Sequence, residues 1–177
     1  MKKTILIIGL VTLVAAFGFA SGAQETADGG EFIIGNGAEP ESLDPHLVSG
    51  VPEHRIMMGI YEGLVTPDPE TATAMPGVAE SWEISSDGTV YTFTLRDDAV
   101  WSDGTPITAQ QVRDSWIRIL DPETAAPYAW FPSMFIKGAA EFNSGDAGVD
   151  ALAVEALDDR TFRFETVGPL PYTLDAL

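Results

Sequence analysis

Residues 81–96 read SWEISSDGTVYTFTLR, and this stretch decides the fold. Trp82 and Ile84 alternate with polar residues ahead of Asp87-Gly88, a dipeptide that favours a tight turn. Beyond the turn, apolar residues again occupy every second position: Tyr91, Phe93 and Leu95. Alternation on both sides of a turn predicts a β-hairpin with one face buried and the other in water.

The next residues, WSDGTPITAQQV (101–112), predict a strand end, a turn and then a helix. Trp101 is expected to anchor the end of the strand in the core. Thr108 and Gln111 have the spacing of a capping box, in which each side chain satisfies the other's backbone N–H. Asp121-Pro122 ends the helix, since the residue before proline avoids the helical region. One helical face collects the apolar residues Val112, Trp116, Ile119 and Leu120.

The segments on either side of this region give weaker patterns. FIIG (32–35) suits a buried strand, and residues 52–64 carry apolar residues at helical spacing, with Gly63 expected to close that helix. Residues 122–132 are interpreted as a proline-rich aromatic loop, and residues 138–148 as a polar turn region. Residues 154–167 predict a second pair of strands joined by an Asp-Asp turn.

The first 23 residues have the order of a secretory signal peptide. Lys2 and Lys3 precede an apolar run, and small residues end it, so we expect cleavage after Ala23 or, alternatively, Ala20. Residues 24–31 are interpreted as a flexible linker. No cysteine follows the apolar run, which argues against a lipid anchor. The sequence therefore predicts an exported protein that is free in the periplasm.

The charge balance restricts the class of partner. The chain has 27 acidic and 9 basic residues and a formal net charge of −18. A surface this acidic repels phosphate backbones, so nucleic acid is not an expected partner. With no cysteine, an exported domain has no disulfide, and packing of a core has to stabilise it.

Motifs for chemistry are weak. His46 and His54 have neither cysteines nor helical i, i+4 spacing beside them, so no metal site is predicted. GNG (35–37) lacks the rest of a dinucleotide-binding fingerprint. Carboxylates are so abundant that a pair of them has little diagnostic value, although a secreted glycosidase stays open as an alternative. We therefore expect no enzyme, no catalytic residue and no cofactor. Loop aromatics are candidate binding groups instead: Tyr128, Trp130 and Phe131.

A series of motifs carries a family resemblance. From about Ala38 onward the sequence resembles the oligopeptide-binding proteins of bacterial ABC transporters, solute-binding protein family 5. The matching stretches are EPESLDPH (39–46), GVPE (50–53), YEGL (61–64), PGVAESWEISSDGTVYTFTLRDDAVWSDGTPITAQQV (76–112), SW (115–116), DPETAAPYA (121–129), ALDDRTF (156–162) and PLPY (169–172).

This resemblance implies a mixed α/β fold, the N-terminal part of a two-lobe, type II-like periplasmic binding protein. Residues 32–60 would start the first lobe, and residues 61–177 would form most of an extra α+β domain on it. The second lobe would be absent from this chain, so we expect an N-terminal fragment that does not bind peptide alone.

The resemblance also implies a function and a site. The family encloses an extended peptide between two lobes and delivers it to the permease subunits of an ABC importer, and we expect a monomer. Two places match peptide-contacting positions: the backbone of Ser49, Gly50 and Val51, and the side chain of Tyr128. The same scaffold tuned to a dipeptide, murein peptide, nickel chelate or sugar remains an alternative. WSDGTPITAQQV is then scaffold rather than site.

Overall fold

A computed structural model describes residues 32–177 of the protein. The predicted signal peptide (1–23) and the predicted linker (24–31) therefore lie outside the described residues. Residues 36–177 form one compact unit, and residues 32–35 are not part of it. No helix within residues 32–177 combines the length and the apolarity that crossing a membrane requires.

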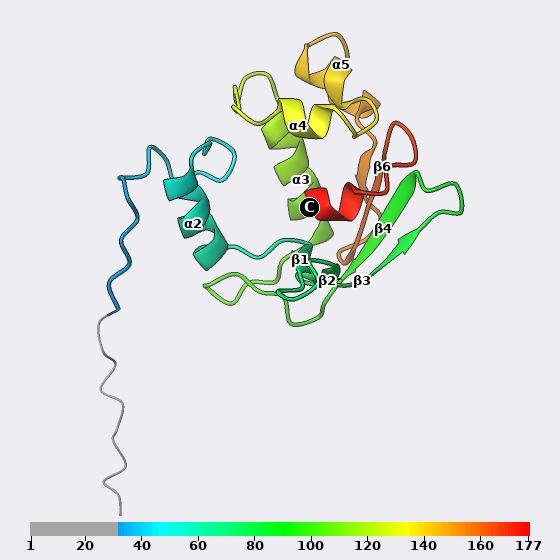
Figure 1. The fold of residues 1–177 in the computed structure, drawn as a ribbon. Helices are drawn as coiled ribbons and strands as arrows, with labels where there is room; N and C mark the ends of the chain where they lie inside the picture. The colour runs from blue at the N-terminus through cyan, green and yellow to red at the C-terminus, as the bar shows by residue number, and fades with distance from the viewer. Residues whose placement is uncertain (1–31) are drawn as a thin grey trace, which may run out of the picture. The chain divides into compact units, whose positions relative to one another are not determined.

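A four-stranded antiparallel sheet is the centre of the compact unit (Figure 1). Its spatial order is β3-β4-β6-β5, from β3 (Ala79–Ile84), β4 (Val90–Leu95), β5 (Val154–Ala156) and β6 (Thr161–Glu165). The predicted hairpin is confirmed, because Trp82 pairs with Phe93 and the turn holds Gly88 at φ +75°. The second predicted pair of strands is confirmed as well, as β5 and β6.

One face of this sheet carries the core. The alternate residues Tyr91, Phe93 and Leu95 of β4 are buried, as the hydrophobic pattern predicts. Phe162 and Phe164 of β6 are buried beside them, and the rings of Tyr91 and Phe164 stack at 5.2 Å between centroids. Burial of these large side chains from two neighbouring strands is the main source of stability that the sheet has.

Helix α3 (Ala109–Leu120) covers that face of the sheet (Figure 1). It begins with the predicted capping box, in which Gln111 N donates to Thr108 Oγ1 and Thr108 N donates to Gln111 Oε1. It ends at Leu120, directly before Asp121-Pro122, as expected. Its apolar face packs on the core, and Trp116 lies 6.1 Å from the Phe164 ring.

Shorter elements complete the unit. A two-stranded antiparallel sheet joins β1 (Val65–Pro67) to β2 (Ala74–Pro76). The remaining helices are α2 (Val51–Ile60), α4 (Trp130–Ser133), α5 (Ala139–Asn143) and the 3₁₀ turns Val149–Ala151 and Thr173–Ala176. The regions 122–132 and 138–148 are thus not entirely loop, because α4 begins at the end of the first and α5 lies within the second.

Three sequence expectations are wrong. Residues 32–35 form no strand and Phe32, Ile33 and Ile34 are exposed, because no described strand offers its backbone to them. Helix α2 ends at Ile60 and not at Gly63. Tyr61 is extended, and the next residue, Glu62, forms a two-point ion pair with Arg96 at 2.8 and 3.0 Å. That pair draws the chain toward the sheet before another helical turn forms.

Trp101 is the third case. Its side chain is not in the core, since the residue is 40% exposed. The chain has already turned at the fully buried Ala99, and the indole Nε1 donates to Gln111 Oε1 at 3.0 Å. Trp101 therefore lies over the start of α3 on the surface.

Candidate functional site

The Ser49–Val51 segment is a largely exposed stretch that leads from extended backbone at Gly50 into Val51, the first residue of α2. Gly50 is the N-cap of the helix, with φ −109° and ψ 166°, and Pro52 follows in the first turn. Ser49 is exposed and Val51 is 62% exposed. The Gly50 C=O already accepts from His54 N at 3.0 Å, so strand-like pairing with a peptide would use the backbone groups of Ser49 and the Val51 N–H here.

The buried side chain of Glu53 supports the backbone on the inner side of this segment. Its residue is only 4% exposed, and its Oε1 accepts a hydrogen bond from the Glu41 backbone N–H at 2.7 Å. The Glu41 amide, followed by the amide of Glu53 itself, holds the pKa of this carboxyl below its usual range. Its Oε2 has no hydrogen-bond partner among the described residues and lies where a Cβ on Gly50 would stand.

Two polar side chains that precede Ser49 in the chain, Asp44 and His46, contact Ser115 and Arg118 on α3. We call these four side chains the Arg118 cluster. The Arg118 guanidinium forms a two-point ion pair with Asp44, at 2.7 and 2.6 Å. It also donates to His46 Nδ1, and His46 Nε2 lies 2.9 Å from Ser115 Oγ. The planar fork of arginine matches a carboxylate in this way, which a lysine could not reproduce.

This geometry shifts the pKa values of Asp44 and His46. The hydrogen bond from Arg118, reinforced by the His46 amide, lowers the pKa of Asp44 to about 2. Burial lowers the pKa of His46, and the neighbouring Arg118 charge lowers it further. The neutral imidazole accepts from Arg118 at Nδ1, so its proton belongs on Nε2, facing Ser115.

Tyr128 lies on the loop between α3 and α4. It is 45% exposed, and its ring lies 6.0 Å from that of Trp130, which is 54% exposed. Phe131 behaves differently, since it is half-buried and packs edge-to-face on Phe135 at 5.5 Å. Two of the three loop aromatics are thus available to a ligand, and the third belongs to the core.

The structure brings the predicted site residues together only in part. Ser49, Gly50 and Val51 are one continuous surface. No hydrogen bond or ring contact within residues 32–177 joins them to Tyr128. Both regions are connected instead to α3, one through the Arg118 cluster and the other through the chain itself. Sequence patterns gave no sign of the cluster, because Asp44 and Arg118 lie 74 positions apart and either could be an ordinary surface charge.

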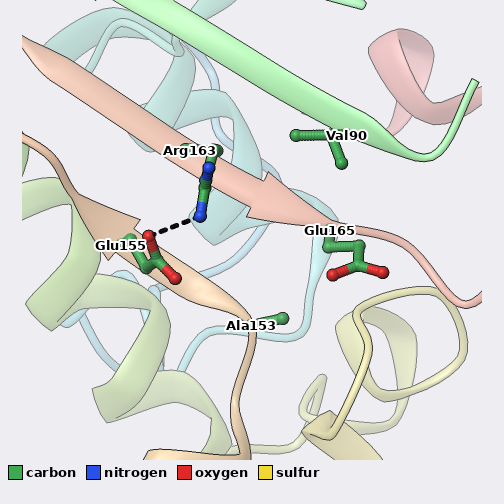
Figure 2. A pocket seen from close by; sticks show the side chains of 5 residues that line it. All are labelled: Val90, Ala153, Glu155, Arg163 and Glu165. Atoms are coloured by element: carbon green, nitrogen blue, oxygen red, sulfur yellow. Dashed lines mark hydrogen bonds and ion pairs between the residues drawn. The ribbon is translucent and has the colours of Figure 1, made fainter. Parts of the chain in front are cut away.

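A separate hollow lies on the outer face of the sheet (Figure 2). It encloses about 170 Å³ and is lined by Val90, Ala153, Glu155, Arg163 and Glu165. Arg163 reaches across it to Glu155 at 2.7 Å, and Glu165 pairs with Lys137 at 2.6 Å. The charged side chains of this hollow are therefore already paired, either with each other or with Lys137. None of the predicted site residues lines it.

Within residues 32–177 no group of three or more His, Cys, Asp or Glu side chains is placed to hold a metal ion. The two histidines have different surroundings: His46 belongs to the Arg118 cluster, whereas His54 lies exposed on α2.

Comparison with known proteins extends the sequence resemblance. Residues 73–177 match the family described as bacterial extracellular solute-binding proteins, family 5 Middle. The periplasmic oligopeptide-binding protein OppA of Haemophilus influenzae is 46% identical over 143 residues, which is 80% of this chain and 26% of that protein. The chain thus spans about a quarter of the length of this relative.

Solved structures agree in fold. The H. influenzae OppA complex with the peptide RPPGFSPFR superimposes with a TM-score of 0.73 at 44% identity, covering 78% of this chain and 27% of that one. The murein tripeptide-binding protein MppA of Escherichia coli gives 0.73 at 42% identity, covering 77% and 27%. The chain belongs to the bacterial extracellular solute-binding proteins, family 5, and the expected mixed α/β fold is confirmed.

Proposed function

We propose that this chain supplies peptide-contacting segments of the first lobe of an oligopeptide-binding subunit that serves an ABC-type importer. The observation that carries the proposal is the exposed surface at Ser49 and Val51, where the backbone passes from extended at Gly50 into α2, in a member of this family. In the proposed division, residues 32–60 begin the first lobe and residues 61–177 form an α+β domain on it.

The chemistry of recognition follows from main-chain groups. An extended peptide pairs with another extended backbone through N–H and C=O groups that every peptide has, so the pairing is independent of sequence. Tyr128 adds an aromatic surface for a ligand side chain, and Trp130 extends that surface. Binding in this manner involves no covalent step, and we propose that the protein is not an enzyme.

Location and partners follow the family. The signal-like residues 1–23 and the periplasmic relatives support an exported, periplasmic protein that presents its ligand to membrane permease subunits. The net charge of −18 supports a monomeric, self-repelling surface that does not bind nucleic acid. The similarity to a murein tripeptide-binding protein keeps that ligand class as a second candidate on the same scaffold.

The test uses a hybrid in which residues 36–177 replace the matching segment of H. influenzae OppA. The probe is RPPGFSPFR, the peptide bound by that relative. We expect Tyr128→Ala to weaken its affinity by about tenfold, the size typical of an aromatic contact in an interface. Trp101→Ala is the matched control, an equally exposed aromatic outside the site. An equal loss in both variants, or in neither, would contradict the assignment of Tyr128.

Ligand class is decided by a second measurement on the same hybrid. Mass spectrometry of molecules that co-purify from a periplasmic extract should show a mixture of oligopeptides. A single murein tripeptide species would favour the second candidate instead, and the absence of any peptide would count against the proposed function.

A further inference from the structure

Residues 36–60 form a small hydrogen-bonded body of their own within the compact unit. The Asn36 amide donates to Pro52 O at 3.2 Å, and Arg55 donates back to Asn36 O at 3.1 Å. The buried Glu53 carboxylate closes the intervening loop by accepting from Glu41 N at 2.7 Å. The Ser49–Val51 segment is part of this body, so the placement of the body sets the placement of the segment.

The attachment of this body to the sheet and helices is narrow. No side chain of residues 36–60 is part of the hydrophobic core or packs against it, in the part of the chain that the structure describes. Within the same part, every hydrogen bond and ion pair from residues 36–60 to residues beyond Tyr61 ends on Ser115 or Arg118. Both partners are on α3, whose last residue, Leu120, leads directly into the loop that carries Tyr128.

We propose that Arg118, through Asp44 and His46, is a positioning residue for ligand binding: it sets the placement of the Ser49–Val51 backbone relative to the Tyr128 loop. This inference rests on the proposed function for the identity of the ligand. Its physical basis is independent of that function, because a two-point guanidinium–carboxylate pair fixes orientation as well as distance. Arg118 itself touches no ligand in this arrangement.

The choice of arginine is specific. One terminal nitrogen of Arg118, Nη1, donates to both Asp44 Oδ1 and His46 Nδ1, and the other, Nη2, donates to Asp44 Oδ2. A lysine provides a single charged point without the fork, so it would keep attraction to Asp44 and lose the fixed orientation. Arg118→Gln removes the charge as well.

The first experiment tests the attachment in the 177-residue chain, without any ligand. The chain has no cysteine, so His54→Cys on α2 and Glu83→Cys on β3, both exposed, accept one nitroxide label each. Double electron–electron resonance should give one narrow distance distribution in this parent. Arg118→Gln should broaden it, whereas Arg113→Gln should not, because Arg113 is on the same helix but, within residues 32–177, its ion pair is with its neighbour Asp114 at 3.3 Å. An unchanged narrow distribution in Arg118→Gln overturns the proposal.

The second experiment tests positioning, in the hybrid with RPPGFSPFR as the probe. We expect Arg118→Gln to weaken the affinity by about fivefold, the loss that the strongest exposed ion pairs give, mainly through faster dissociation. Arg118→Lys should recover part of that loss and Arg113→Gln should cause none. Broadened distances with unchanged affinity and dissociation rate would overturn the positioning role. A hybrid that binds no peptide would refute the proposed function, while the distance measurement would still decide the attachment.

Discussion

Two tryptophans on neighbouring segments show how one residue type is used in opposite ways. Trp116 packs at 6.2 Å against Phe135 and at 6.1 Å against Phe164, so its ring is a part of the core. Trp101 lies on the surface, where its indole donates a hydrogen bond to Gln111. The sequence pattern gave both the same role, because periodicity identifies an apolar residue but not the layer that it reaches.

The contrast predicts different stability costs for the two truncations. Trp116→Ala should lower the free energy of unfolding by about 3 kcal/mol, since it removes a large core side chain. Trp101→Ala should cost about 1 kcal/mol, the value of one hydrogen bond and some surface packing. Urea unfolding of both variants followed by circular dichroism measures the difference. Equal costs would mean that Trp101 is buried after all.

The Arg118 cluster predicts a dependence of stability on pH. The pKa of His46 is lowered in the folded chain, so the unfolded chain binds its proton more readily. The stability that neutral His46 contributes is therefore fully present above about pH 6.5 and is lost as the pH falls below that value. Asp44 also contributes stability that is lost as the pH falls, but at lower pH, because its folded pKa of about 2 lies below the unfolded value of 3.8.

Unfolding free energies between pH 7.5 and pH 5 test the His46 part. His46→Asn removes the titrating ring, so this variant should lose less stability on acidification than the parent does. Identical pH profiles would show that His46 is not linked to folding.

Elements were predictable from the sequence wherever local chemistry decides them. The hairpin needs Asp87-Gly88 and alternate apolar residues, and α3 needs Thr108 and Gln111, all within a few positions of one another. Residues 32–35 could not be predicted in this way. An apolar run becomes a strand only when another strand pairs with it, and the residues of the run do not determine whether such a partner is present.

Two glycines with left-handed backbones allow a prediction about connections between elements. Gly138, before α5, has φ +79°, and a Cβ there would overlap the Ala151 carbonyl oxygen. Gly104 has φ +85° but open space around it. Gly104→Ala should therefore cost only the left-handed strain, about 1–2 kcal/mol.

Gly138→Ala bears that strain and also has to move the backbone at Ala151, so it should be clearly more destabilising. Thermal and urea unfolding of the two variants provide the comparison. If Gly138→Ala cost no more than Gly104→Ala, the close approach between the start of α5 and the 3₁₀ turn Val149–Ala151 would be disproved.

At the scale of the whole molecule, the candidate site depends on contacts between distant segments. The resemblance placed Ser49–Val51 and Tyr128 in the site, and the structure finds both regions exposed. The cluster that joins the first region to α3 could not be predicted, because its four members come from two segments far apart in the chain and have no shared motif. Only the folded arrangement brings these four side chains together, and in it residues 36–60 place no side chain in the core.

This arrangement leads to a prediction about affinity. Ser49–Val51 and Tyr128 lie on open surface, and the hollow on the outer face of the sheet includes neither of them. A peptide that binds them loses about 4–15 kcal/mol of translational and rotational freedom. Each hydrogen bond that it gains contributes about 0.5–1.5 kcal/mol net, and water competes for every one on an open surface.

A few such bonds and one aromatic contact only balance the lower end of that cost. We therefore expect the 177-residue chain to bind RPPGFSPFR with a Kd weaker than about 1 mM, whereas the hybrid, which adds the rest of a peptide-binding relative, should bind it far more tightly. Isothermal titration calorimetry of both proteins with the same peptide makes the comparison. Saturable micromolar binding by the chain itself would show that one exposed surface suffices, and the site would then have to be more enclosed than Ser49–Val51 and Tyr128 are.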